Sequence, residues 1–207
     1  MLKKAIVVSH ERSGTHFLLN TLAANFGYKA RPLWNLDYET GLNFFAPSAL
    51  QQAFFDHFAP GEANLVKSHH PVECFQPILP ALLARFWILY IYRDPRDVMV
   101  SFCEHLRNLP YHGGPKLAEA GALLRAEPTG GLLRYQWRQY PHLLARWEAH
   151  VSGWLAAAAQ DAERRIIVVR FEDLHQAFAA SVQQLAHALE RPKRFFGAAR
   201  NIEEGGS

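Results

Sequence analysis

The sequence predicts an α/β fold, a three-layer sandwich in which a central parallel sheet is flanked by helices. Apolar segments with strand character alternate with helical segments along the chain, and this order favours parallel strands joined by right-handed crossovers. Two of the strand–turn–helix junctions carry an arginine and small hydroxyl residues, where the amino terminus of a helix can hold an anion. With 207 residues, 49% of them apolar, the chain is expected to form one domain over residues 1–207.

Each expected element rests on its pattern of apolar residues and on the signals at its ends. β-branched and aromatic runs predict strands at 5–8, 64–68, 86–92 and 165–170. Helical spacing predicts helices at 15–26, 49–58, 79–85, 95–107, 140–160 and 174–190. Residues without a period are expected to form a loop at 28–47, and Pro and Gly predict a mobile insert at 108–115 and 127–131.

Charge and cysteine content set bounds on the function. The formal net charge is +3, which favours no general polyanion binding and hence no nucleic-acid partner. Cys74 and Cys103 are too few for a disulfide framework, and no Cys/His spacing fits zinc, so a cytoplasmic protein is expected. The apolar run after Lys3 and Lys4 ends at Val8, which is too short for a signal peptide, and no segment is long enough to span a membrane.

The first junction has the sequence Arg12-Ser13-Gly14-Thr15 between the first strand and the first helix. Such a turn points backbone N–H groups at a phosphate, and Arg12 supplies a cation. It is not a Walker A loop, because Gly14 has no glycine partner upstream and no lysine after it. The alternative is a plain strand–turn–helix junction in which Ser13 caps the helix.

The second junction begins at Arg93, which ends the clearest strand of the chain. Asp94 is expected to cap the next helix, with Pro95 in its first position and Ser101 nearly two turns further along. A charged side chain at a strand end must be solvated, paired or bound to a ligand. The alternative to an anion is therefore a local salt bridge from Arg93 to Asp94 or Asp97.

A third segment carries a candidate base. Lys67 and His69 alternate in an extended chain, so their side chains are expected to point the same way, and Pro71 favours extending this geometry. A histidine can accept a proton near neutral pH, and a nearby lysine charge favours the neutral imidazole that a base needs. His69 is therefore the candidate base, whereas His70 should face the other way and be structural.

These segments resemble motifs of the PAPS-dependent sulfotransferases, where PAPS is 3′-phosphoadenosine 5′-phosphosulfate. Residues 90–101 (YIYRDPRDVMVS) resemble the 3′-phosphate motif of that family. Residues 12–17 (RSGTHF) resemble its 5′-phosphosulfate loop. Residues 65–71 (LVKSHHP) are similar to the Lys-Thr-His segment that carries its catalytic histidine.

Two later segments agree with the same family in order and type. Residues 147–154, with His150, resemble its late helix, and residues 168–174 (VVRFEDL) resemble its Tyr-Glu-Asp-Leu strand end. The resemblance covers most of residues 5–190 and implies a P-loop-like fold. With the last two segments counted as one motif, four motifs in the correct order are a strong signal, although each motif alone is weak.

The resemblance implies roles at the matching positions. Phe17 would lie against the adenine, and Arg93 and Ser101 would hold the 3′-phosphate. His69 would be the base, and Lys67 a neighbouring cation on the transferring group. Arg12 would also stabilise charge on the leaving phosphate. The implied ligands of the 5′-phosphosulfate are Arg12, Ser13, Gly14, Thr15 and His16.

The implied activity is transfer of a sulfuryl group from PAPS to a hydroxyl or amine acceptor, without a metal, leaving adenosine 3′,5′-bisphosphate (PAP). The acceptor is expected to be a small molecule, apolar or aromatic. Two alternatives stay open: a P-loop kinase acting on a small molecule, and a non-catalytic nucleotide-binding protein. Aromatic residues that could line an acceptor pocket, or form ordinary core, are Trp34, Tyr38, Phe44, Phe45, Phe54 and Phe55.

The family closes its 3′-phosphate site with an Arg-Lys-Gly segment near the carboxyl terminus. Residues 200–207 contain no such string. Three alternatives stay open here. The chain is truncated before that segment, the 3′-phosphate site is incomplete, or other cations substitute, the candidates being Arg191, Lys193 and Arg194.

Overall fold

The computed structural model describes residues 3–29, 33–36, 42, 44–57, 64–108 and 119–191, which contain a parallel sheet of order β2-β3-β1-β4-β5. Every adjacent pair of strands in this sheet is parallel, so the predicted fold class is confirmed. The strands are β1 Lys4–Ser9, β2 Trp34–Asn35, β3 Leu65–Ser68, β4 Phe86–Tyr92 and β5 Ile166–Arg170.

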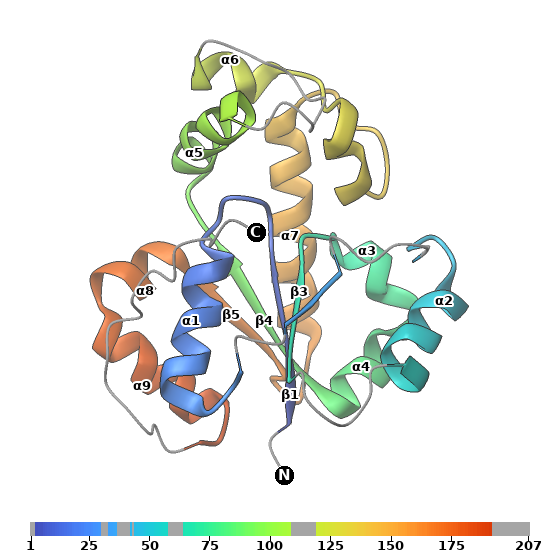
Figure 1. The fold of residues 1–207 in the computed structure, drawn as a ribbon, viewed down its shortest axis with the longest axis vertical. Helices are drawn as coiled ribbons and strands as arrows, with labels where there is room; N and C mark the ends of the chain where they lie inside the picture. The colour runs from blue at the N-terminus through green and yellow to red at the C-terminus, as the bar shows by residue number, and fades with distance from the viewer. Residues whose placement is uncertain are drawn as a thin grey trace.

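Helices cover both faces of the sheet, and a further group lies beyond the carboxyl ends of its strands (Figure 1). One face carries α1 Thr15–Phe26, α8 Phe171–Gln176 and α9 Phe178–Ala188. The other face carries α2 Pro47–Gln52, α3 Val72–Phe75, α4 Leu79–Arg85 and α7 Leu143–Gln160. Beyond the strand ends lie α5 Pro95–Asn108 and α6 Ala120–Arg125. Within the described residues, no helix has the length and apolar character needed to cross a membrane.

The side chains of each strand alternate between two apolar cores. Val7 of β1 packs with Leu18 of α1 on one face of the sheet. Ile6 of β1 and Tyr90 of β4 pack with Trp154 of α7 on the other face. The central strands β1 and β4 are thus buried on both sides, which is typical of a parallel sheet. This packing fixes the loops that follow the strands at one common edge.

The expectation of a loop over residues 28–47 is wrong at one point. Trp34–Asn35 form β2, an edge strand that pairs with Val66 and Lys67 of β3. Two residues are too few to show the period of a strand, so the sequence gives no signal for it. The candidate acceptor residue Tyr38 lies outside the described residues.

Two further expectations about the chain between the main elements need correction. The helix predicted at 49–58 ends at Gln52, and a π-helical turn, Ala53–His57, follows it. α6 lies between the two stretches of the predicted insert, and a 3₁₀ helix, Gly130–Tyr135, begins within the second, while residues 109–118 lie outside the described part of the chain. Burial of apolar side chains against α5 stabilises these short elements, although local Gly and Pro favour a loop.

The predicted bounds of α4 and β4 are confirmed, but the last two helices differ from the prediction. α7 begins at Leu143, because the His142 side chain accepts the Ala145 N–H and caps the helix there. Ala177, with φ −120° and ψ 48°, leaves the helical conformation. It divides the helix predicted at 174–190 into α8 and α9.

Candidate active site

The residues that the sequence singles out lie at the carboxyl edge of the sheet. Residues 10–14 follow β1, residues 69–71 follow β3, and residues 93–94 follow β4. These three strands are neighbours in the order β3-β1-β4, so their loops meet at one place. Ligands of parallel α/β sheets bind at this edge.

The loop after β1 has the backbone of an anion-binding turn. Gly14 is the N-cap of α1 with φ 94° and ψ 24°, a left-handed conformation that favours glycine. A side chain at this position would also overlap the Phe171 ring. Ser13 makes no capping hydrogen bond, so the alternative in which it caps the helix is wrong. Its Oγ is buried and, within the described structure, has no hydrogen-bond partner.

Arg12 connects this loop to α5. Its Nε donates to the Ser101 hydroxyl at 3.1 Å, and its Nη1 lies 3.5 Å from Nδ1 of His105. The resemblance assigns Arg12 and Ser101 to different phosphates, and the structure brings the two side chains into contact. Arg12 itself has φ 65°, which is uncommon for a residue with a side chain. The loop therefore holds this arginine in a strained conformation that faces α5.

Arg93 lies in the loop after β4 with both a partner and an unsatisfied donor. Its Nη2 is 3.6 Å from Oδ2 of Asp97, so the alternative salt bridge is present. Its guanidinium carbon lies 4.5 Å from the centre of the Phe171 ring. Its Nε is buried and lacks a hydrogen-bond partner among the residues described. Asp94 caps α5 as predicted, accepting the Arg96 N–H at 2.9 Å.

His69 is tied to the first loop through Ser9. Its Nδ1 lies 3.0 Å from the Ser9 carbonyl oxygen and 3.2 Å from the Ser9 hydroxyl, which lies 2.5 Å from the Thr15 hydroxyl. A carbonyl oxygen can only accept, so Nδ1 carries a proton, and in the neutral form of the ring the lone pair is on Nε2. The contact with Ser9 orients the ring toward the start of α1.

Lys67 and His70 flank this histidine in different ways. Lys67 is 5% exposed and pairs in register with Val7, whose side chain faces α1. Lys67 therefore also faces α1. His70 is 3% exposed, bonds to the Ser68 hydroxyl at 3.0 Å and stacks on Phe44 at 3.5 Å between ring centres. It packs in the interior, as the prediction of a structural role expects.

A buried polar cluster lies directly behind the first loop, and the sequence interpretation did not anticipate it. Arg146 of α7, 1% exposed, donates to Glu11 Oε1 at 2.7 Å, to His10 Nε2 at 3.0 Å and to the Tyr135 carbonyl at 3.2 Å. His10 in turn donates from Nδ1 to the Glu11 carbonyl at 3.0 Å. Because arginine can only donate, His10 Nε2 is an acceptor and this histidine is neutral.

The titration behaviour of this cluster agrees with its contacts. Burial lowers the pKa of His10 to about 4, although the Glu11 charge opposes the shift. Burial by itself would raise the pKa of Glu11, but the charge of Arg146 and its hydrogen bond hold this pKa below its ordinary value. In the described part of the chain, no group of three or more His, Cys, Asp or Glu side chains could hold a metal ion.

The same face of α7 also contacts the His69 segment. His150 donates from Nε2 to the His69 carbonyl at 3.2 Å and accepts the Tyr90 hydroxyl at Nδ1, at 3.0 Å. Burial lowers the pKa of His150 well below its ordinary value. Trp154 donates to the carbonyl of residue 70 at 3.3 Å. Arg146, His150 and Trp154 are four residues apart, so they lie on one face of α7. This spacing was the signal in the sequence from which the three side chains could have been grouped.

Phe17 and His16 differ in their surroundings. The Phe17 ring lies within about 6 Å of the rings of Phe171 and Phe178, with centre-to-centre distances of 6.0 Å and 6.1 Å. Phe17 is thus part of an aromatic group between α1 and α8–α9 that is partly buried. His16 is exposed at the start of α1.

The proposed substitute cation Arg191 does not lie at this edge. Its Nη1 donates to the Phe26 carbonyl at 3.2 Å, at the carboxyl end of α1. Phe26 is eleven residues after Thr15, so this end lies about 16 Å from the anion-binding end of the helix. The alternative in which Arg191 completes the 3′-phosphate site is therefore wrong. Lys193 and Arg194 lie outside the described residues.

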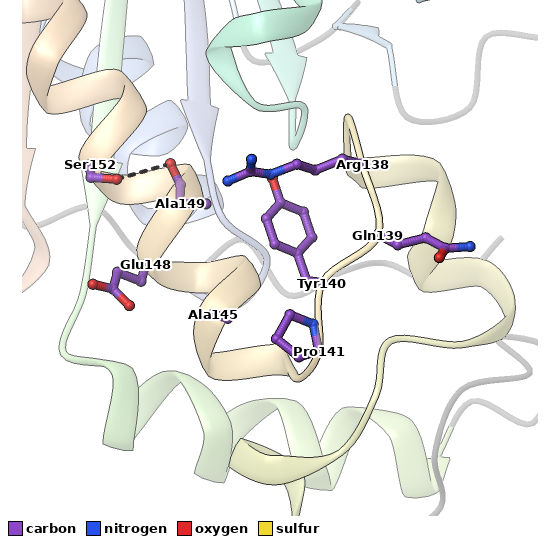
Figure 2. A pocket seen from close by; sticks show the side chains of 8 residues that line it. All are labelled: Arg138, Gln139, Tyr140, Pro141, Ala145, Glu148, Ala149 and Ser152. Atoms are coloured by element: carbon purple, nitrogen blue, oxygen red, sulfur yellow. Dashed lines mark hydrogen bonds between the residues drawn. The ribbon is translucent and has the colours of Figure 1, made fainter.

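A separate cavity of about 420 Å³ lies beside α7 (Figure 2). In Figure 2 Arg138 extends over Tyr140 toward this helix, and its guanidinium carbon is 5.4 Å from the Tyr140 ring centre. Burial raises the pKa of Tyr140, and the hydrogen bond from Arg138 opposes part of that shift. The lining of this cavity contains none of the residues that the sequence predicts for the site.

The chain matches a known family over nearly its whole length. The model of the family described as "Sulfotransferase domain" matches residues 2–202, and the chain belongs to that family. A segment of 22 residues, 11% of this chain, is 96% identical to transcription termination factor Rho of Pseudomonas aeruginosa and covers 5% of that protein. So short a match shows no family.

Solved sulfotransferase structures share the fold. Mouse sulfotransferase SULT7A1 complexed with PAP superposes with a TM-score of 0.60 and 17% identity, over 93% of this chain and 60% of that chain. Retinol dehydratase in a complex with retinol and PAP gives a TM-score of 0.60 and 19% identity, over 92% and 61%. These likenesses establish the P-loop-like fold.

A curated relative agrees with the family assignment. Sulfotransferase 2A1 of Homo sapiens is 21% identical over 193 residues, which cover 89% of this chain and 58% of that protein. The chain thus spans less than two thirds of the length of this relative and of the two solved structures.

Proposed function

We infer that this protein transfers a sulfuryl group from PAPS to a small acceptor, with His69 as the general base. The proposal rests on two of the buried donors that have no hydrogen-bond partner in the described structure: the Ser13 hydroxyl and Arg93 Nε. One lies in each of the two loops assigned to phosphates. A buried donor without a partner lowers the stability of the fold by about 1–3 kcal/mol. Such atoms are therefore expected at a site where a bound ligand accepts their hydrogen bonds.

The donors fit the two ends of PAPS. The amino terminus of α1, the Ser13 hydroxyl and Arg12 supply hydrogen bonds and charge for the 5′-phosphosulfate. Arg93 and Ser101 supply them for the 3′-phosphate. Arg12 contacts Ser101, which supports a single continuous nucleotide site. SULT7A1 and retinol dehydratase, which share the fold, were both solved with PAP.

The tautomer of His69 supports its role as base. Nε2 carries the lone pair because Nδ1 donates to the Ser9 carbonyl. In the proposed reaction Nε2 takes the proton of the acceptor hydroxyl or amine while the acceptor atom bonds to sulfur. The bond between sulfur and the 5′-phosphate oxygen breaks, and its electron pair stays on that oxygen of PAP. Lys67, Arg12 and the loop amides stabilise the charge that develops on the sulfuryl and phosphate oxygens.

An apolar or aromatic acceptor fits the surface beside His69. Phe44 stacks on His70, and the Tyr135 ring packs on both histidine rings at 5.6 Å and 5.4 Å. Phe45 follows Phe44 in the chain, and Trp137 lies two residues after Tyr135. The side chains of Phe45 and Trp137 are 63% and 39% exposed, and their ring centres are 5.3 Å apart. This aromatic pair offers a planar acceptor a surface on which to stack. Of the other aromatic candidates, Phe54 is buried in the core.

Titration calorimetry with PAP, 5′-AMP and ATP, each with excess EDTA, tests the nucleotide assignment. PAP should bind at least tenfold more tightly than 5′-AMP, because only PAP reaches Arg93 and Ser101. Turnover of PAPS with phenols and aliphatic alcohols should also survive EDTA. Preference for ATP and dependence on Mg²⁺ would favour the kinase alternative. Tight PAP binding without transfer to any acceptor would favour the non-catalytic one.

A further inference from the structure

We propose that Arg146 is a positioning residue that sets the shape of the phosphate loop, residues 9–14, and its place relative to His69. Neither the sequence motifs nor the family assignment gives this α7 residue a role. The inference rests on the proposed function, because it concerns the same site. It is carried by contacts between α7 and two of the three loops that meet at the carboxyl edge of the sheet, those after β1 and β3.

Arg146 acts on the two residues that immediately precede Arg12. Its Nη1 donates to the His10 ring and its Nη2 to the Glu11 carboxylate and the Tyr135 carbonyl. His10 and Glu11 are 0% and 7% exposed, so these contacts are made away from water. The planar fork of arginine reaches the three partners at once, which a lysine ammonium cannot do in the same geometry.

These contacts hold the loop in a path that its sequence does not favour. Arg12 follows Glu11 with φ 65°, a conformation that costs free energy for a residue with a side chain. With Glu11 anchored in the interior, Arg12 faces the opposite way and donates to Ser101. Release of Glu11 would allow the loop to relax, and the Arg12 guanidinium would lose its contact with Ser101.

The same helix face also fixes the other half of the site. His150 and Trp154, four and eight residues after Arg146, donate to the carbonyls of residues 69 and 70. Four residues of helix span about 6 Å, so one rigid row of side chains spaces the phosphate loop from the base segment. Arg146 is therefore the contact through which α7 sets the loop against His69.

The test replaces the ion pair as a unit. Removing Arg146 alone would leave the Glu11 carboxylate buried without a partner, so Arg146→Met is combined with Glu11→Leu to keep the interior packed. Hydrogen exchange of loop 9–14 in this variant should be about tenfold faster than in the unchanged protein. The Kd for PAP should rise about tenfold, and kcat should fall as well. Arg146→Lys, which keeps the charge, should give the same changes in smaller degree.

Leu82→Ala is the matched control. Leu82 is fully buried in α4, far from the carboxyl edge, so its loss lowers stability without touching the loop. It should lower Tm about as much as the Arg146 variants do. The hydrogen exchange of loop 9–14 and the Kd for PAP should nevertheless stay unchanged. Unchanged loop exchange in both Arg146 variants would overturn the positioning role. Failure of the unchanged protein to bind PAP would instead overturn the proposed function, while hydrogen exchange would still decide the role of Arg146.

Discussion

The loop after β1 and the loop after β4 carry the two predicted phosphate sites, and different kinds of contact support them. Behind the first loop, Arg146 and Glu11 form an ion pair whose side chains are 1% and 9% exposed. Beside the second, Arg93 pairs with Asp97, which is 56% exposed. Removal of one member of a buried ion pair strongly destabilises the fold, whereas an exposed pair contributes about 0–1 kcal/mol to the free energy of unfolding. The first loop is therefore fixed before ligand binds, and the second can exchange partners.

This difference predicts that the largest effect on the chemical step comes from a change beside the first loop. His69 follows β3 and contacts that loop through Ser9. His69→Ala should lower kcat by about 10²- to 10⁴-fold, the usual contribution of a general base, with the Kd for PAP within twofold. Turnover of PAPS with a phenol and calorimetry with PAP give the two quantities. His187→Ala, at an exposed position of α9, is the control and should change neither. Retained turnover in the His69 variant would remove the base assignment.

Changes on the second-loop side should affect binding. Arg93→Ala removes charge-assisted hydrogen bonds to the 3′-phosphate, worth about 1.5–3 kcal/mol, so the Kd for PAP should rise about 10- to 150-fold. The affinity for 5′-AMP, which lacks that phosphate, should stay the same. Equal losses for both nucleotides would show that Arg93 acts on the fold rather than on the 3′-phosphate.

The buried support of the first loop should make the protein sensitive to acid. The folded pKa of His10 is about 4, below its ordinary value of 6.5, so the unfolded chain binds the extra proton first as pH falls. The free energy of unfolding should therefore decrease from pH 7 to pH 5, with His10 accounting for about 2 kcal/mol. Urea unfolding at both pH values measures this loss.

Two variants separate His10 from other titrating groups. His10→Gln should reduce the loss between pH 7 and pH 5, whereas His187→Gln, on the surface of α9, should keep it. The depressed pKa of Glu11 also lowers the free energy of unfolding as pH falls below about 4.5. The unfolded chain binds the Glu11 proton near its ordinary pKa of 4.5, whereas the folded protein binds it only at lower pH. An unaltered pH dependence in the His10 variant would mean that this ring is not held neutral.

The smallest expected effect concerns the exposed ion pair. Asp97→Asn releases Arg93 from a carboxylate that competes with the 3′-phosphate. The Kd for PAP should therefore fall about 1.5- to 5-fold, in keeping with the weak energy of exposed pairs. Calorimetry at low and high salt checks this, because added salt should reduce the difference. Weaker binding in this variant would show that Asp97 orients Arg93 rather than competing for it.

The sequence predicted those parts of the fold that depend on neighbouring residues. The parallel sheet, the cap at Asp94 and the interior position of His70 each follow from local patterns, and the structure contains them. β2 escaped prediction because two residues show no period. α6 escaped it because burial against α5 outweighs the local signals.

The parts of the site that the sequence did not predict depend on contacts between distant segments. Glu11 and Arg146 are 135 residues apart, so no local pattern connects them. His10 reads as an ordinary packing or surface histidine until α7 is placed behind the loop. Likewise, the contact of Arg12 with Ser101 follows from the left-handed conformation at residue 12, which a sequence motif does not specify.

The most direct test is a crystal structure of the protein with PAP. The 3′-phosphate should accept hydrogen bonds from Arg93 and Ser101, and the 5′-phosphate from Ser13 and the amino terminus of α1. His69 Nε2 should face the side of the 5′-phosphate from which an acceptor approaches. PAP bound away from these loops, or with its phosphates out of reach of Ser13 and Arg93, would contradict the account.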